Sequence, residues 1–167
     1  MLLSLATILN QPGGKVPFSM EMDCAGMEFG SQKPASEPLR AEGQVRNEAG
    51  VLILTGTVDT TLHCVCDRCA ASFDKPFHLD MEAVLVPELA SEQNEDEQTF
   101  VLKEDAADLE EILNTVFVLN MDSRFLCRED CLGICPTCGK DLNDGPCDCK
   151  PESDPRWAAL KQLLADQ

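Results

Sequence analysis

The chain has 167 residues, enough for one domain with a modest apolar core. It carries 30 acidic side chains against 13 lysines and arginines, a net charge of −17 at pH 7. Proteins that grip RNA or DNA present a basic surface, so this charge argues against an extensive direct nucleic-acid interface and favours basic protein partners. The first ten residues lack the basic flank and cleavage site of a secretion signal, and no run reaches membrane-spanning length. We therefore expect a soluble, cytoplasmic protein.

Two stretches in the first half of the chain alternate apolar and polar residues, the period of a half-buried strand. The first stretch puts Leu52, Leu54, Val58, Leu62 and Cys64 on one face, and the second does the same with Phe77, Leu79, Met81, Ala83 and Leu85. Weaker strand signals cover residues 16–23 and 38–47, and Asn-Glu-Ala-Gly at 47–50 indicates a turn. Consecutive strands with short turns predict an antiparallel β-meander.

The second half contains two helix signals and an acidic stretch. Residues 87–98 carry five carboxylates and little apolar surface, which indicates a solvated loop. A helix is expected at about 106–119, capped by Asp105, with an apolar face made of Leu109, Ile112, Leu113 and Val116. A second, C-terminal helix is expected after Asp154 and Pro155. The predicted fold class is α+β: a β-meander domain over 1–122 with one or two packed helices, and a cysteine-rich zinc-binding segment over 123–167 packed on the same domain.

The stretch CREDCLGICPTCGKDLNDGPCDC, residues 127–149, holds six of the ten cysteines. In a reducing compartment such clusters bind metal more often than they form disulfides. A tight turn at Cys135 and Cys138 aims two sulfurs at one point, and Cys147 and Cys149 follow a loop that can reverse direction. Four thiolates around one tetrahedral ion fit zinc and leave no open position for catalysis, so we expect a structural zinc site.

Four further cysteines are candidate ligands, namely Cys127 and Cys131 in the same stretch and Cys66 and Cys69 in the predicted hairpin turn. Two zinc sites would use all eight cysteines. The alternative is one site that joins the hairpin pair to Cys135 and Cys138. The spacing does not distinguish these arrangements.

The other sulfur and imidazole groups are expected to be structural. Cys24 and Cys64 have the character of small buried hydrophobic residues, and His63 and His78 lie on predicted strands rather than in a ligand motif.

An enzymatic interpretation rests on Cys131, Cys135 and Cys138, whose spacing matches the iron–sulfur motif of radical enzymes. Those enzymes resemble a large barrel, whereas this motif follows nearly all of the predicted sheet. Asp67 and the preceding strand also argue against a redox pair at Cys66 and Cys69, since such pairs need basic neighbours or a helix N-terminus.

The combined pattern resembles the YceD family, the large ribosomal RNA subunit accumulation proteins. The resemblance rests on the hairpin Cys66-Asp67-Arg68-Cys69 with Phe73, the cysteine stretch with its Cys-Gly-x-x-Leu-Asn element, and Asp154-Pro155-Arg156. It implies a bacterial or plastid cytoplasmic protein needed for 23S ribosomal RNA to accumulate, and it supplies no catalytic residues. Some relatives lack the C-terminal cysteines, which implies that the metal supports the fold. The chain departs from relatives at Asn120-Met121-Asp122 and at Trp157, away from every cysteine.

These observations predict a non-enzymatic, zinc-stabilised factor in large-subunit biogenesis, acting as an acidic adaptor for a basic ribosomal or ribosome-assembly protein. The alternative is a zinc or iron–sulfur enzyme that acts on RNA. Between Arg124 and Lys161, six basic and seven acidic side chains nearly balance, so most of the negative charge lies elsewhere. We also expect metal removal to unfold the region after residue 126 while strands between 50 and 86 persist.

Overall fold

A computed structural model describes residues 1–87 and 98–149. Nearly all of the acidic loop predicted at 87–98 and the whole predicted C-terminal helix lie outside these residues. No helix in the described part of the chain has the length and apolar character needed to cross a membrane.

The described chain forms a five-stranded sheet with strand order β2-β3-β4-β5-β6 and a separate two-stranded sheet, β1-β7. Pairings from β2 to β5 are antiparallel, which confirms the predicted meander, whereas the short β6 joins β5 in parallel. The α+β fold class is confirmed. The element bounds are β1 Leu2–Ser4, β2 Lys15–Met22, β3 Leu39–Glu48, β4 Val51–Val65, β5 Ser72–Val86, β6 Thr99–Val101, β7 Ala106–Asp108, α1 Leu109–Leu119 and a 3-10 turn, η2, Leu142–Asp144.

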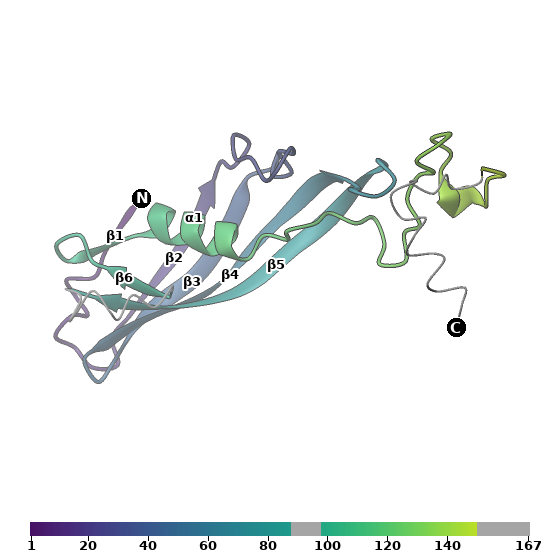
Figure 1. Cartoon of the computed structure of the whole chain (residues 1–167). Coiled ribbons are helices and arrows are strands. Elements are labelled where there is room, and N and C mark those ends of the chain that lie inside the picture. The colour runs from purple at the N-terminus through teal and green to yellow at the C-terminus, as the bar shows by residue number, and fades with distance from the viewer. Residues whose placement is uncertain (88–97, 150–167) are drawn as a thin grey trace, which may run out of the picture.

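The hairpin β4-β5 is the longest element, with pairing from Leu52 opposite Leu85 to Val65 opposite Ser72. The alternation expected from the sequence is present in β4, where Leu54, Val58 and Leu62 are fully buried. Strands of this length carry their cysteine-bearing turn well beyond the sheet's other strands, as Figure 1 shows.

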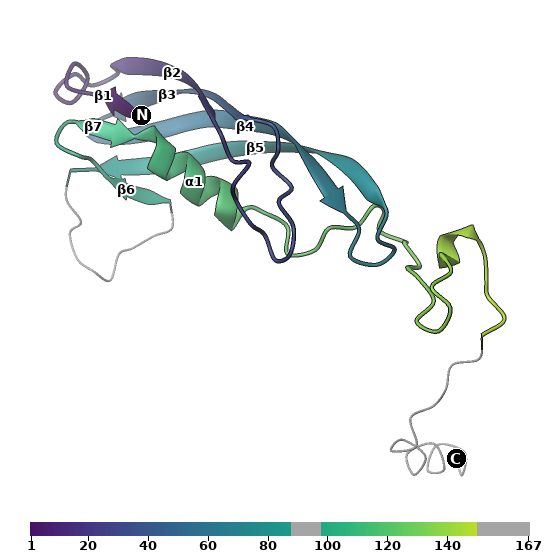
Figure 2. The ribbon, with the colours of Figure 1, turned by 90° about the horizontal axis from the view of Figure 1, so that it is seen from above.

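Helix α1 lies against one face of the sheet (Figures 1 and 2) and closes the core. Its buried residues are Leu109, Ile112, Leu113 and Phe117. The Phe117 ring meets those of Phe29 and Phe77 edge-on, with centroids 5.6 and 5.2 Å apart. Phe117 joins this apolar face, and the expected Val116 is half-buried and packs against the same core.

The predicted start of this helix is wrong. Residues 106–108 form β7, which pairs with β1, and the helix begins at Leu109 after Asp108. The carboxylate of Asp108 makes no capping hydrogen bond and instead accepts one from Lys103 Nζ at 2.8 Å. The strand pairing with β1 is a long-range contact, so local helix propensity could not predict it.

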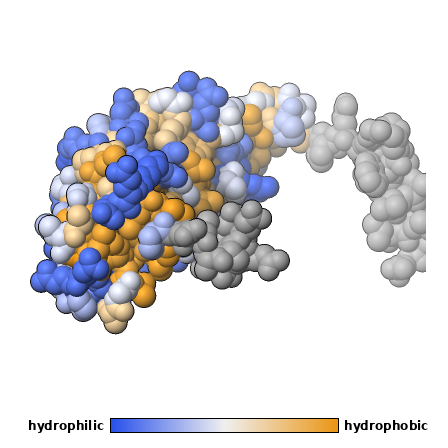
Figure 3. Space-filling view, turned by 90° about the vertical axis from the view of Figure 1, so that its left-hand side faces the viewer, coloured by the Kyte–Doolittle hydropathy of each residue, from blue (hydrophilic) through white to orange (hydrophobic). Residues whose placement is uncertain are grey.

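The two ends of the sheet carry different parts of the chain. Figure 3 views the molecule from the end that carries β1 and β6, where hydrophobic residues cover much of the visible face among hydrophilic ones. Met1, Leu2 and Val101 are exposed. Residues 124–149, which contain the C-terminal cysteines, lie beyond the opposite end, past the turn between β4 and β5 (Figures 1 and 2).

Candidate metal centres

The turn between β4 and β5 presents Cys66 and Cys69. The Cys66 N–H donates to the Ala71 carbonyl at 2.8 Å, and the Ala70 N–H donates to the Cys66 carbonyl at 2.9 Å. Ala70 has a φ of 59°, which tightens the turn. Both cysteines are buried although they lie at a hairpin tip. Another part of the chain must therefore cover them.

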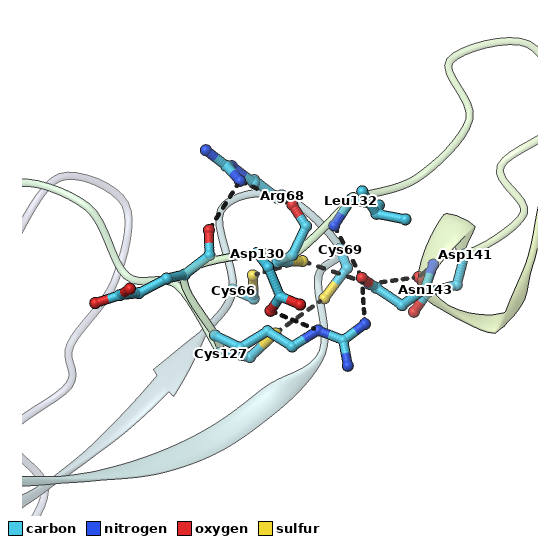
Figure 4. Close-up of polar contacts among 11 residues, drawn as sticks. Cys66, Arg68, Cys69, Cys127, Asp130, Leu132, Asp141 and Asn143 are labelled. Atoms are coloured by element: carbon cyan, nitrogen blue, oxygen red, sulfur yellow. Dashed lines mark hydrogen bonds and ion pairs between the residues drawn. The ribbon is translucent and has the colours of Figure 1, made fainter.

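That covering part is the segment that begins near Phe125. The Asp67 N–H donates to the Phe125 carbonyl at 2.8 Å, and the Phe125 N–H donates to Asp67 Oδ2 at 2.7 Å. Arg68 Nη1 donates to the Cys131 carbonyl at 2.8 Å (Figure 4). These bonds hold the segment over the hairpin tip. We call residues 124–149 the cysteine segment.

The result is a group of four thiols, site 1, made of Cys66, Cys69, Cys127 and Cys131. Its four sulfurs lie within 4.8 Å of one another. The Sγ atoms of Cys66 and Cys131 are 3.8 Å apart, and those of Cys69 and Cys127 are 3.7 Å apart. Figure 4 shows the hairpin and segment sulfurs facing one another.

A second group, site 2, contains Cys135, Cys138, Cys147 and Cys149, with the same limit of 4.8 Å between sulfurs. A tight turn forms its first half, in which the Gly139 N–H donates to the Cys135 carbonyl at 2.9 Å and Gly139 has a φ of 73°. The Cys135 N–H donates to the Lys140 carbonyl at 2.8 Å, so residues on both sides of the turn pair like a small ribbon. This turn was expected from the Cys-Pro-Thr-Cys-Gly sequence.

The sulfur spacing fits a single tetrahedral ion. With metal–sulfur bonds of about 2.3 Å, the edges of a tetrahedron are about 3.8 Å long. The spacings of 3.7 and 3.8 Å in site 1 match this edge and far exceed the roughly 2.05 Å of a disulfide. In a [4Fe–4S] cluster each thiolate binds a different iron, which holds the sulfurs farther apart. Both groups could hold a metal ion, and the donor set suits a soft, tetrahedral one.

The thiols differ in how readily they ionise. Burial disfavours the Cys66 thiolate, but N–H groups of Cys127, Cys69 and Arg68 outweigh it and lower the pKa of Cys66 to about 6. N–H groups of Cys138 and Thr137 likewise lower the pKa of Cys135 to about 6. In each site, therefore, backbone donors stabilise one thiolate before any metal arrives.

Each site also contains a thiol that resists ionisation. Burial, together with the neighbouring sulfurs of site 1, raises the pKa of Cys127 to about 12. The hydrogen bond with Cys138, together with burial, raises the pKa of Cys149 to about 12. Four negative charges at this spacing repel one another, and a divalent cation at the centre would remove that repulsion.

The structure gathers all eight candidate cysteines into two groups of four. Of the two arrangements that the sequence left open, this is the one with two metal sites. The hairpin pair lies with Cys127 and Cys131, and not with Cys135 and Cys138. The iron–sulfur spacing does not form one site, because Cys131 belongs to site 1 whereas Cys135 and Cys138 belong to site 2.

The residues expected to be structural lie outside both groups. Cys24 and Cys64 are buried in the sheet core, and burial raises the pKa of each thiol. His63 Nδ1 is 2.6 Å from Asp74 Oδ1, and His78 Nδ1 is 2.6 Å from Asp59 Oδ1. Neither histidine belongs to a potential metal-binding group in the described chain.

In the stretch that joins the two sites, the aliphatic side chains are exposed and the residues between them are buried, the reverse of the usual pattern. Cys131, Gly133 and Cys135 are buried, while Leu132 and Ile134 are 66% and 45% exposed. An ordinary strand buries its aliphatic side chains. Here the inward positions belong to sulfur ligands, so apolar burial does not hold this part of the segment together.

The sequence did not reveal that three further residues support the metal sites. Asp67 and Arg68 bind the cysteine segment through the bonds given above, and Asn143 donates from Nδ2 to Cys131 Sγ at 3.4 Å. Their position inside or between the cysteine motifs was the available signal. Their partners are 12 to 63 residues away in sequence, however, and the spacing of the motif does not encode such contacts.

Comparison with known proteins supports the pattern seen in these residues. A family model described as "Large ribosomal RNA subunit accumulation protein YceD" matches residues 54–164. The chain belongs to the YceD family. The match begins in β4 and includes every cysteine of sites 1 and 2.

Mycobacterial proteins are among the curated relatives. The chain is 30% identical over 120 residues to uncharacterised proteins of Mycobacterium tuberculosis and Mycobacterium bovis, covering 71% of this chain and 58% of theirs. An uncharacterised Mycobacterium leprae protein is 23% identical over 130 residues, covering 77% of this chain and 60% of that protein. The chain thus spans less than two thirds of the length of these relatives. No solved structure matches it.

Proposed function

We propose that this YceD-family chain is a non-enzymatic, zinc-stabilised cytoplasmic factor that supports 23S ribosomal RNA accumulation and large-subunit biogenesis. The family match carries the biological part of the proposal. The pairing of hairpin and segment cysteines in site 1 carries the structural part. Zinc is the metal proposed because it accepts four thiolates in a tetrahedral shell without redox chemistry.

The donor sets favour a structural role for the metal. Four cysteines per site fill a tetrahedral shell, whereas a catalytic zinc keeps a position open for water or substrate. Site 1 joins residues that are more than 55 positions apart in sequence, so a metal there would link the hairpin to the cysteine segment. Such a link would stabilise the fold and would not require the metal to catalyse a reaction.

A basic partner is proposed from the distribution of charge. The outer face of the sheet exposes Glu42, Asp80 and Glu82, and the register places Glu42 and Asp80 on either side of Thr57. In the cysteine segment, the exposed Arg128 is paired with Asp130 at 3.5 Å, which reduces its availability to phosphate. With a net charge of −17, the chain fits a basic ribosomal or assembly protein better than naked RNA.

The adaptor hypothesis is tested by measuring the affinity of the zinc-loaded protein for purified basic large-subunit proteins and for naked 23S ribosomal RNA. We expect binding to at least one protein, weakening steeply as salt rises, and weak binding to RNA at physiological salt. The triple variant Glu42→Gln, Asp80→Asn and Glu82→Gln should weaken the protein complex. A control with the same change in charge, Glu104→Gln, Asp105→Asn and Glu129→Gln, should not.

Three outcomes would contradict parts of the proposal. Tight, specific binding of the isolated protein to 23S RNA at physiological salt would exclude the adaptor hypothesis. Cleavage or modification of precursor 23S RNA by the purified, metal-loaded protein would favour the alternative, a metal-dependent enzyme. In cells, depletion of the protein should lower the ratio of 23S to 16S RNA. An unchanged ratio would contradict the proposed role in 23S RNA accumulation.

A further inference from the structure

Asn143 lies between two cysteines of site 2 in the sequence, but its side chain contacts a cysteine of site 1. It lies in η2, within the eight residues that separate Cys138 from Cys147. Its side chain nevertheless reaches Cys131 of site 1, where Nδ2 lies 3.4 Å from the sulfur. Figure 4 shows this amide between the site 1 sulfurs and Asp141.

The Asn143 amide uses its full hydrogen-bonding capacity. Its oxygen accepts from Arg128 Nη2 at 2.6 Å and from the Leu132 N–H at 2.8 Å. Its nitrogen donates to Asp141 Oδ1 at 2.7 Å and to Cys131 Sγ. Turning the amide over would place oxygen against a carboxylate and a thiolate, so the four partners together define its orientation.

The position of Asn143 depends on the loop closed by site 2. Cys138 and Cys147, at the two ends of this loop, are both members of site 2, so a metal bound there fixes the loop ends together. Lys140 Nζ donates to the Pro146 carbonyl at 2.8 Å within the loop, and the Leu142 N–H donates at 2.8 Å to the carbonyl of Gly133, which lies outside the loop and two residues from Cys131. The loop whose ends meet at site 2 therefore carries the amide that contacts site 1.

We propose that the two sites bind metal cooperatively and that Asn143 is the positioning residue that couples them. The inference rests on the metal-binding part of the proposed function. A metal in site 2 holds the loop, the loop holds Asn143, and its N–H group stabilises the Cys131 thiolate as a ligand of site 1. By linkage, a metal in site 1 strengthens site 2 by the same factor. Removing an outer partner of a metal ligand weakens metal binding about 10- to 100-fold, and we expect coupling of that size.

The experiment titrates the reduced, metal-free full chain with Co²⁺ against a competing chelator. Binding is followed by the cobalt–thiolate absorption bands. The two sites are distinguished by protection of their cysteines from alkylation, read by mass spectrometry. Site 2 is disabled by the double variant Cys138→Ser and Cys149→Ser, which leaves site 1 and Asn143 unchanged.

Three results are expected. Disabling site 2 weakens Co²⁺ binding at site 1 about 10- to 100-fold. Asn143→Asp, which keeps the side-chain shape but turns a charged oxygen toward Cys131, weakens site 1 at least as much and shifts its sulfur-to-cobalt band. Combining Asn143→Asp with the disabled site 2 adds little further loss, because both changes remove the same coupling. The control Asn114→Asp makes the same charge change on the exposed face of α1 and leaves both sites unaltered.

The outcomes separate this inference from the proposed function. If site 1 binds Co²⁺ equally well whether or not site 2 is intact, the coupling is absent and the inference is overturned, while metal stabilisation stands. If neither site retains Co²⁺ in the wild-type chain, metal stabilisation itself is overturned. Because the double cysteine variant leaves Asn143 in place, the inference is still tested even if Asn143→Asp does not fold.

Discussion

The sheet and the cysteine segment are stabilised by different kinds of contact. The sheet and α1 share one apolar cluster that includes Leu54, Val58 and Phe117, all fully buried. In the cysteine segment, the buried side chains are Phe125, Cys131 and Cys135, while Leu132 and Ile134 face solvent. The sheet can fold through the hydrophobic effect, whereas the segment lacks the apolar surface to do so and depends on its thiol groups.

The boundary between these two regions does not follow the chain. Site 1 contains two cysteines from the hairpin of the sheet and two from the cysteine segment. The stability of the hairpin tip should therefore depend on the metal, as that of the segment does. The sequence-based expectation placed this boundary at residue 126. The following predictions test where it lies, from the largest expected effect to the smallest.

Removing the metal should produce the largest effect. We expect the cysteine segment and the hairpin tip at 64–73 to lose amide protection together, while the centre of β3, β4 and β5 keeps it. Structural zinc contributes on the order of 10 kcal/mol to small folds, far more than the few apolar contacts of the segment. Hydrogen exchange with and without chelator measures this. Loss of protection at the centre of the sheet would show that the two regions are not separable.

Replacing a single ligand should distinguish the two sites. Cys131→Ser removes a buried ligand that joins hairpin and segment, while Cys138→Ser removes an exposed ligand within the segment. Each variant should lose metal, but with metal in excess, so that a weakened site 1 stays filled, only Cys131→Ser should release the hairpin tip, at a cost on the order of several kcal/mol. Metal content and hydrogen exchange report both effects. Cys24→Ala, outside both sites, should retain the metal content of the wild type.

Two glycines of the segment allow a smaller, matched test. Gly133 and Gly139 have φ values of 75° and 73°, so alanine at either position costs about 1–2 kcal/mol in backbone strain. A Cβ atom on Gly133 would also lie 2.9 Å from the Arg68 carbonyl oxygen, whereas one on Gly139 would meet nothing within 4 Å.

Gly133→Ala should therefore destabilise the segment more than Gly139→Ala, and it should do so by separating the segment from the hairpin. Urea unfolding of the metal-loaded protein gives the difference. Equal losses in the two variants would mean that the contact between Gly133 and Arg68 contributes nothing to the junction.

The smallest effect should come from the histidines of the sheet. Hydrogen bonding to Asp74 raises the pKa of His63, and hydrogen bonding to Asp59 raises the pKa of His78. A raised folded-state pKa stabilises the fold below the unfolded value of about 6.5, and this contribution is lost as pH rises through the folded value. Stability should thus fall slightly as pH rises above about 6.5 in the wild type, and less in the double variant His63→Gln with His78→Gln. NMR titration of the imidazoles checks the direction of both shifts.

The sequence predicted the meander well because period-two alternation is a local signal. It also predicted the turn at 47–50, where Ala49 and Gly50 have positive φ values and the Gly50 N–H donates to Asn47 Oδ1 at 2.8 Å. It missed β7 and the parallel β6, because those short strands are defined by distant partners. The start of α1 was wrong for the same reason.

For the metal centres, the sequence identified the eight cysteines but not their division into two groups. Spacing determines which sulfurs can meet within a tight turn, as at Cys135 and Cys138. It does not determine which distant pair completes the shell. That choice depends on the chain path from α1 to the hairpin tip, which Asp67 fixes through its two hydrogen bonds to the backbone of Phe125.

The long pairing of β4 with β5 has a consequence for strand register. A slip of one residue would turn Leu54, Val58 and Leu62 from the core to solvent, and it would also displace Cys66 relative to Cys69 across the turn. The apolar face along the strands and the thiol group at the turn therefore favour the same register of β4 and β5. A metal ion at site 1 would therefore favour the native register, because it would hold Cys66 and Cys69 next to the pair Val65 and Ser72, where β4 and β5 meet at the turn.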